Sequence, residues 1–297
     1  REGRRRPSRA AEATTAAAGC RRSRRASVCG VRVAAAQRGR LRRRGRADEA
    51  RAGDGDGGRA ALPPPLLQAA EQGHKFVEYN ETAVHLAQMA CSELKRDDVL
   101  IAGGISYWTF TDTFPNSRQL HENVYEQSKI IADAGADLLT LEMMTDIDQM
   151  CTTYEAAKKA GLPVWIGLSC DRDAHGHMRL LESSDGRLGR GESLQQAVRA
   201  ISKDEVDVIN IMHTKVEFVD NCIDILDQEW RGLVGVYAHS GRMVGSKWAF
   251  DEVISKEDYA ISAEKWLRRG VNLIGGCCGI GVDHMACVST KLSAINV

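Results

Sequence analysis

The stretch VNLIGGCCG, residues 271–279, places an apolar run directly before two adjacent cysteines that glycines flank. A short, near-continuous apolar run of this kind is typical of a strand buried on both faces. Successive side chains of a strand point to opposite faces, so Cys277 and Cys278 can reach one point only where the strand breaks into a turn. The flanking glycines supply that freedom. The stretch therefore predicts a buried strand that ends in a thiol pair.

Five further stretches have the same apolar character and alternate with segments of helical period. The strand candidates are VLIAGGIS (99–106), DLLTLEMM (137–144), PVWIGLSC (163–170), VDVINIMHT (206–214) and GLVGVYAHS (232–240). The amphipathic segments lie over 117–135, 146–161, 192–202, 216–228 and 256–270, and several end in a helix-terminating glycine: Gly135, Gly161 and Gly270. Six strands that alternate with helices predict an α/β fold with a parallel sheet.

Polar residues at the strand ends distinguish between two parallel architectures. A doubly wound sheet often carries a glycine-rich phosphate loop after its first strand, whereas a (β/α)8 barrel collects polar side chains at the ends of many strands. Here the strands end in Ser106, Glu142, Ser169 with Cys170, His213, Tyr237 with His239, and Cys277 with Cys278. The glycines near the last strand do not form GxGxxG spacing, so a dinucleotide site is weakly supported. We therefore expect a (β/α)8 TIM-type barrel.

Composition divides the chain into two regions. Residues 1–59 contain 18 arginines, no lysine and 6 acidic residues, a net charge of +12, and because the whole chain is neutral the remainder carries −12. The first region has almost no large apolar side chains, so it cannot bury enough surface to offset the entropy lost on ordering. We expect a disordered Arg/Ala-rich segment over 1–61 and one barrel domain over 62–297.

Three interpretations of the Arg-rich segment stay open. Its composition resembles an organellar transit peptide, which would direct the protein to a plastid or mitochondrion instead of the cytoplasm otherwise expected. Clustered arginine is also typical of a nucleic-acid-binding tail, but the aromatic residues that stack on bases are absent, so a nucleic-acid partner is not favoured. The chain begins at Arg1 and not at methionine, which fits an incomplete or wrongly joined gene model.

Membrane and disulfide-scaffold classes are disfavoured. No window approaches the roughly 18–20 uninterrupted apolar residues of a membrane span. The nine cysteines show no regular framework of spacings and no extracellular signal accompanies them, which favours a reducing compartment with free or metal-bound thiols.

The strand ends resemble a known family. GGCCG (275–279), DLLTLEMM (137–144), VWIGLSC (164–170), RGESLQQAVRAI (190–201) and VYAHSG (236–241) followed by a tryptophan are similar to the homocysteine S-methyltransferases, thiol methyltransferases that include the betaine-homocysteine enzyme. The resemblance covers roughly residues 79–292. It implies a (β/α)8 barrel with zinc held by three cysteines, two from the terminal pair and one from the sixth strand.

The sequence departs from the family at the third ligand. The family has Asn-Cys-Thr followed two residues later by Pro-Glu, whereas this chain has IMHTKVE (211–217), so aligning Thr214 and Glu217 places His213 at the cysteine position. Imidazole can replace thiolate on zinc, which would give a Cys2His site with an open fourth position. The family's Tyr-Pro-Asn in the seventh strand is YAH (237–239), which leaves His239 as the other candidate ligand.

The opening of the family has no counterpart in this chain. EYNETAVHLAQMACSEL (78–94) resembles the helix after strand two, so about six βα units are recognisable and the barrel is expected to be incomplete at its N-terminus. We expect the outer flanks of 99–106 and 271–279 to lack strand partners, because the Arg-rich segment shows no strand pattern. A chain of this form is expected to be a poor enzyme that an authentic, longer N-terminus would restore.

The candidate site residues each have a structural alternative. Cys277, Cys278 and His213 are expected metal ligands, although a buried cysteine pair and a satisfied histidine are the simpler interpretations. Glu142 is costly to bury alone, and the resemblance implies that it binds the substrate amino group, with an internal ion pair as the alternative. Lower-ranked substrate-binding candidates are Tyr237, His239, Ser240 and Ser169. Trp108 and Trp248 are candidates to line the binding site of a cationic methyl donor through cation–π contacts.

Together these features predict a zinc-dependent methyltransferase. Zinc deprotonates a coordinated thiol, and a Cys2His site leaves one position for a substrate sulfur. The resemblance implies small-molecule substrates, with homocysteine converted to methionine by a methyl donor that the sequence does not identify. The sequence does not identify the oligomeric state either. The alternative is a catalytically inactive barrel retained as a binding protein.

Overall fold

A computed structural model describes residues 32–34, 73–107, 115–181, 190–201, 206–244 and 247–293. Its centre is a sheet that contains six parallel strands: β2 (Leu100–Ile105), β3 (Leu138–Met144), β4 (Val164–Arg172), β6 (Val208–Lys215), β7 (Leu233–His239) and β10 (Leu273–Ile274). All six strands expected from the sequence are confirmed. The last is shorter than expected because it ends at Ile274, immediately before the glycines.

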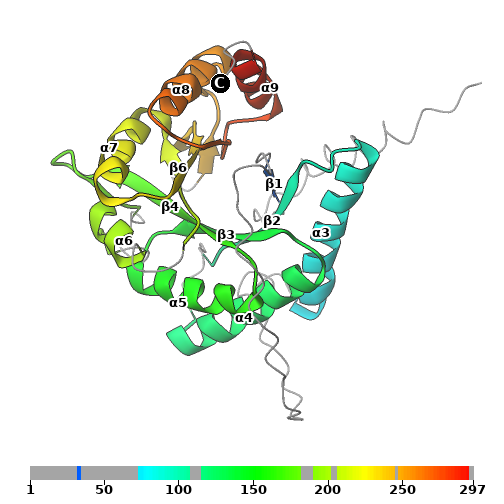
Figure 1. Ribbon diagram of the computed structural model, residues 1–297. Helices are drawn as coiled ribbons and strands as arrows, with labels where there is room; N and C mark the ends of the chain where they lie inside the picture. Colours follow the sequence, from blue (N-terminus) through cyan, green and yellow to red (C-terminus); the bar gives the residue numbers. More distant parts are fainter. Residues whose placement is uncertain are drawn as a thin grey trace, which may run out of the picture.

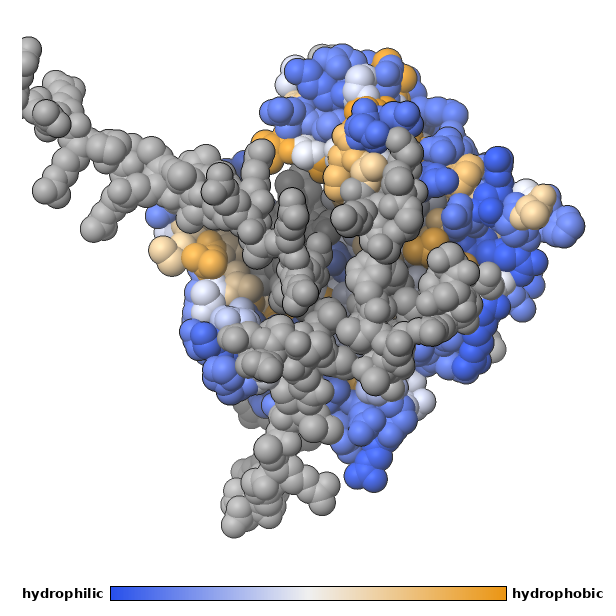
Figure 2. Space-filling view, turned by 180° about the vertical axis from the view of Figure 1, so that it is seen from behind, coloured by the Kyte–Doolittle hydropathy of each residue, from blue (hydrophilic) through white to orange (hydrophobic). Residues whose placement is uncertain are grey.

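Helices connect the parallel strands and surround the sheet (Figure 1). The α-helices of the described part are α3 (Phe76–Glu93), α4 (Ser117–Asp133), α5 (Ile147–Ala157), α6 (Leu194–Ile201), α7 (Val219–Glu229), α8 (Lys256–Arg268) and α9 (Val282–Ser293), with 3-10 turns η2 (Gly73–Lys75), η3 (Lys158–Ala160) and η4 (Val216–Phe218). The helices expected from the amphipathic segments are confirmed. Their outward surface is largely hydrophilic in the view of Figure 2.

Local signals in the sequence set the helix ends. Asn116 and Gln119 form a capping box at the start of α4, and the Ser255 hydroxyl accepts a hydrogen bond from the Asp258 N–H at the start of α8. Gly135, Gly161 and Gly270 have φ values of 94°, 78° and 95°, a left-handed conformation that glycine adopts without steric cost. The expected glycine stops are therefore confirmed.

The strand order is β2-β3-β4-β6-β7-β10, without the reversal that defines a doubly wound sheet. The helices lie outside the curl of the sheet, so the architecture is an open portion of a TIM-type barrel (Figure 1). Residues that face the helices, such as Leu141, Ile166 and Ile209, are in register with one another and belong to the main hydrophobic core. Because side chains alternate along a strand, the intervening residues face the inside of the curl.

The two flanks of the sheet differ, and one expectation was wrong. Strand β1 (Arg32–Ala34) pairs antiparallel with β2, with Val33 opposite Ile101, so the outer flank of β2 is not without a partner. An exposed strand edge offers unpaired N–H and C=O groups to any extended segment, which explains how three residues of an arginine-rich stretch can pair there. Among the described residues, β10 pairs with β7 alone.

Short antiparallel strands accompany the parallel sheet. Strand β5 (Met178–Leu180) pairs with the end of β4, and β8 (Arg242–Val244) forms a hairpin with β9 (Lys247–Ala249). The described residues contain no helix long and apolar enough to cross a membrane. Apart from 32–34, the predicted disordered segment lies outside the described residues, as do Trp108 and the side chain of Trp248.

Candidate functional site

The carboxyl ends of the parallel strands bring most of the predicted polar residues to one edge of the sheet. Ser169, Met212 and Tyr237 lie side by side in register on β4, β6 and β7 and face the inside of the curl. A glycine makes room there. A Cβ at Gly167 would lie 2.6 Å from the Tyr237 hydroxyl oxygen and 2.9 Å from the Met212 sulfur. This glycine therefore allows the tyrosine and methionine side chains to fill the interior.

The cysteine pair lies where the last strand gives way to a turn, as the sequence predicts. Gly275 and Cys277 donate backbone hydrogen bonds of 2.8 and 2.9 Å to Val236 and Ala238 of β7, and the Cys278 carbonyl accepts one of 2.9 Å from Ser240. The Ile280 N–H closes a turn on the Cys277 carbonyl at 3.1 Å, and Gly279 has φ +79° as in a type II turn. The turn lets both thiols approach the same point.

His213 reaches that point from a distorted strand. Its φ is +43°, which is unusual for a residue with a side chain, and the pairing of β6 with β7 shifts register between Met212 and Lys215. The Thr214 hydroxyl, fully buried, donates to the Met212 carbonyl at 2.9 Å and accepts from the Cys170 N–H at 3.0 Å. These two bonds hold the bulge that turns the histidine towards the cysteines.

The three side chains form a compact group. His213 Nδ1 lies 3.5 Å from the Cys277 sulfur and 3.7 Å from the Cys278 sulfur, and the two sulfurs are 3.9 Å apart. His213 is 8% exposed and both cysteines are half-buried. Within the described ranges, no other group of three His, Cys, Asp or Glu side chains brings its ligand atoms this close together. The arrangement can hold one metal ion.

The ring of His239 packs against the ring of His213. Its ring centroid is 4.5 Å from that of His213, with the rings tilted by 41°. Burial, together with the neighbouring His213, lowers the pKa of His239 to about 4. The imidazole is therefore neutral near neutral pH and adds no positive charge beside the candidate metal position. Of the two histidines, His213 is the one with a ring nitrogen near both sulfurs.

The other predicted residues occupy different positions. Glu142 is buried at the carboxyl end of β3, where the pairing with β4 changes register. The Ser169 hydroxyl donates to the Met143 sulfur at 3.3 Å. Ser240 is next to the cysteine turn, but its hydroxyl accepts a hydrogen bond of 2.8 Å from the Ile254 N–H. The structure thus brings Ser169 and Tyr237 to the interior, and Ser240 anchors a loop.

Sequence reasoning missed two methionines that join the bulges of β3 and β6. Met143 has φ +59°, and its N–H donates to the Met212 sulfur at 3.0 Å. No sequence motif predicts this contact, because the two residues are 69 positions apart in the chain and come together only in the folded sheet. The bulged strands therefore support each other next to Glu142 and His213.

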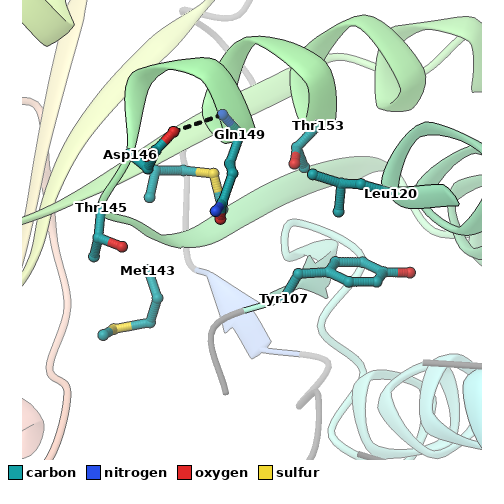
Figure 3. A pocket seen from close by; sticks show the side chains of 8 residues that line it. Tyr107, Leu120, Met143, Thr145, Asp146, Gln149 and Thr153 are labelled. Atoms are coloured by element: carbon teal, nitrogen blue, oxygen red, sulfur yellow. Dashed lines mark hydrogen bonds between the residues drawn. The ribbon is translucent and has the colours of Figure 1, made fainter. Parts of the chain in front are cut away.

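A separate recess lies at the start of α5 (Figure 3). It is lined by Tyr107, Leu120, Met143, Met144, Thr145, Asp146, Gln149 and Thr153. Asp146 caps α5 by accepting a hydrogen bond of 2.9 Å from the Gln149 N–H. The Asp-Ile-Asp sequence at this helix start is a capping signal. None of the predicted site residues lines the recess.

Seven cysteines lie in the described part and all are free thiols. Cys222 is fully buried, and Cys151 and Cys287 pack against the hydrophobic core from their helices. The described cysteines are therefore free thiols, and these three take part in packing the core.

Comparison with known proteins places this arrangement in a family. The profile of the family described as homocysteine S-methyltransferase matches residues 63–292. Homocysteine S-methyltransferase 1 of Zea mays is 26% identical over 171 residues, 55% of this chain and 49% of that protein. Selenocysteine methyltransferase of Astragalus bisulcatus is 23% identical over 219 residues, 68% and 61% of the two chains. This chain thus spans about half to three fifths of the length of these relatives.

A solved structure shares the fold. The metallated form of the homocysteine methyltransferase MmuM from Escherichia coli has a TM-score of 0.56 and 18% identity, over 78% of this chain and 76% of that one. At this identity the likeness concerns the fold alone, and the family assignment rests on the sequence match over most of the chain. This chain belongs to the homocysteine S-methyltransferase family.

Proposed function

We propose that this protein transfers a methyl group to the thiol of homocysteine at a zinc ion bound by Cys277, Cys278 and His213. The observation that carries the proposal is the spacing of the three ligand atoms. Zinc bonds of about 2.3 Å to sulfur and 2.0 Å to nitrogen place tetrahedral ligands about 3.8 Å apart for two sulfurs and about 3.5 Å for sulfur and nitrogen. The separations here are 3.9 Å between the sulfurs and 3.5 and 3.7 Å to the nitrogen.

The three ligands suit the chemistry of thiol alkylation. A free thiol has a pKa near 8.5 and is mostly protonated at neutral pH. Zinc would supply the lowered pKa that makes a substrate thiol nucleophilic, and three protein ligands leave the fourth position for it. The turn that contains Cys277 and Cys278 and the bulge at His213 would hold the ligands in place, while neutral His239 packs behind them.

The residues inside the curl suit the rest of an amino-acid substrate. A carboxylate is the natural partner of an ammonium group, and Glu142 lies buried at the end of β3, so we assign it the amino group of homocysteine. Tyr237 and Ser169 face the same interior and are proposed to line the acceptor. His239 and Ser240 contribute by shaping the surroundings of the metal ligands.

The names of the relatives agree with a soft acceptor atom. They act on homocysteine or selenocysteine, whose sulfur and selenium are both polarisable nucleophiles. For the donor we propose a small methyl-bearing cation, a sulfonium or a quaternary ammonium, because each has a neutral leaving group. Because this chain spans only part of those relatives, the activity of the whole protein is itself part of the proposal.

The direct test is a methyl-transfer assay on the full chain. Homocysteine is incubated with S-methylmethionine, S-adenosylmethionine or betaine, and methionine is measured by mass spectrometry. We expect methionine with at least one donor, loss of product on chelation, and recovery with added Zn²⁺. Homoserine, which has a hydroxyl in place of the thiol, is the control acceptor and should give no product. A chain that binds zinc but makes no methionine with any donor would support the inactive binding protein instead.

The bulge that aims His213 gives a second expected result. Thr214→Val removes both hydrogen bonds of the buried hydroxyl and should lower zinc affinity by about tenfold, in the range usual for loss of support behind a ligand. Thr214→Ser keeps the hydroxyl and should restore most of the affinity. Affinity is measured by competition with a chromophoric chelator, with the Co²⁺ absorption spectrum as a report on ligand geometry.

Thr153→Val is the matched control, since Thr153 is also buried but lies on α5. It should leave the affinity for zinc and the Co²⁺ spectrum unchanged. Equal zinc affinity in Thr214→Val and the wild type would show that the bulge does not depend on these bonds.

A further inference from the structure

Helix α3 has a second apolar face that points away from the core. Its inner face buries Phe76, Asn80, Val84 and Ala87 against the sheet and α4. On the opposite side, Tyr79 is 38% exposed, Leu86 58% and Met89 56%. A helix that only covers a sheet needs one apolar stripe, with polar residues on its outer side. The second stripe therefore calls for a separate explanation.

The outer stripe has the spacing of a helix–helix contact. Lys75, Tyr79, Thr82, Leu86, Met89 and Glu93 follow one another at alternating steps of four and three residues. This is the seam that faces a partner in paired helices. Within the protomer, the Lys75 ammonium lies 5.7 Å from the centre of the Tyr79 ring, so this lysine lies along the same stripe. The stripe is thus apolar in its middle, basic at its start and acidic at its end.

This stripe is complementary to itself when reversed. The positions are symmetric about residue 84, so a second α3 running antiparallel would place Tyr79 beside Met89 of the partner subunit and Thr82 beside Leu86 of the partner subunit. The same register places Lys75 beside Glu93 of the partner subunit, and the two-fold axis repeats each pair. A parallel arrangement would instead set Lys75 against its own copy.

We propose that a second copy of this chain docks on this face, with the two α3 helices antiparallel in this register. The charge pairs at the ends of the stripe select the register, and the aromatic and aliphatic side chains between them supply the buried area. Figure 1 shows α3 as the first helix of the outer ring, and Figure 2 shows an orange, apolar area on the side of the molecule where α3 lies.

The size of the contact fixes the expected strength. Eighteen residues make a helix about 27 Å long, and a single pair of such helices buries less surface than a standard interface of about 1,600 Å². We therefore expect a reversible dimer with a dissociation constant in the micromolar range. None of the candidate site residues lies on α3, so each protomer keeps its own candidate site.

The first test measures the mass of the full chain by sedimentation equilibrium from low to high micromolar concentration. We expect a monomer–dimer equilibrium for the wild type and at least about a tenfold weaker association for Leu86→Glu, because the stripe would then bury a carboxylate twice. Ile261→Glu is the matched control: Ile261 is 57% exposed on α8, and its replacement should leave association unchanged.

The second test identifies the register. Lys75→Glu and Glu93→Lys should each weaken the dimer, because each single change sets two like charges against each other at both ends. The double variant Lys75→Glu, Glu93→Lys restores opposite charges and should recover association to within about threefold of the wild type. Recovery of this kind requires that the two positions meet across the interface.

Three results would overturn the proposal. A wild type that stays monomeric throughout the concentration range excludes the dimer. A dimer that Leu86→Glu leaves intact lies on another surface. A monomer in which Leu86→Glu lowers the melting temperature, while Ile261→Glu does not, would show that another segment of the same chain covers this face.

Discussion

Replacing Cys277 and Cys278 together with alanine is expected to remove nearly all zinc from the purified full chain. Two of the three proposed ligands disappear, and the remaining imidazole cannot by itself supply the roughly 10–16 kcal/mol with which protein sites hold structural zinc. Elemental analysis should show a fall from about one zinc per chain to below about a tenth. Methyl transfer should be lost with the metal.

The control for this experiment comes from the same chain. Cys151 and Cys287 are half-buried thiols on α5 and α9, and the double variant Cys151→Ala, Cys287→Ala removes the same number of sulfur atoms elsewhere. It should retain zinc. If Cys277→Ala, Cys278→Ala also retained zinc, the metal would be bound by other residues and the proposed function would fail.

His213→Ala is expected to lower zinc affinity by about 100-fold, while His213→Cys retains the metal. The cysteine variant supplies a thiolate, which zinc accepts in place of imidazole. Both variants put a non-glycine residue into the same left-handed backbone conformation, so any strain at φ +43° is common to them and their difference reports on ligation. Competition titration measures the affinity.

A spectroscopic measurement separates ligation from folding. With Co²⁺ in place of zinc, the sulfur-to-metal absorption should strengthen in His213→Cys, because three thiolates would then bind where two did. His239→Ala is the control, and its zinc affinity should exceed that of His213→Ala. The reverse order would make His239 the ligand and His213 the neighbour.

Much of the fold follows from local features of the sequence. Apolar runs such as VLIAGGIS and DLLTLEMM became strands because a parallel sheet buries both faces, and the glycine stops adopted the conformation that glycine favours. The thiol pair was also predictable, because adjacent cysteines among glycines can converge only in a turn. These signals lie within a few residues of the element that they determine.

The remaining features depend on contacts that no local pattern encodes. His213 points at the cysteines where β6 bulges, and Thr214 in this bulge accepts a hydrogen bond from the N–H of Cys170, 44 residues earlier in the chain. The pairing of β1 with β2 was missed for a similar reason, since it uses backbone groups that every residue possesses. The composition of the Arg-rich segment predicted that the outer flank of β2 would have no strand partner. Strand pairing depends instead on the unpaired backbone groups that a sheet edge offers.

The proposed metal ion would also act as a cross-link. His213 belongs to β6 and Cys277 follows β10, and the whole of β7 lies between these two strands in the sheet. Strand β10 itself has only two residues in register with β7, and backbone hydrogen bonds from Gly275 and Cys277 continue its attachment beyond the strand. A single ion bound by both partners would close a loop between positions 64 residues apart and restrict the unfolded chain as a covalent bridge does. Metal loading would thus strengthen the attachment of the C-terminal unit, β10 with α9, to the rest of the sheet.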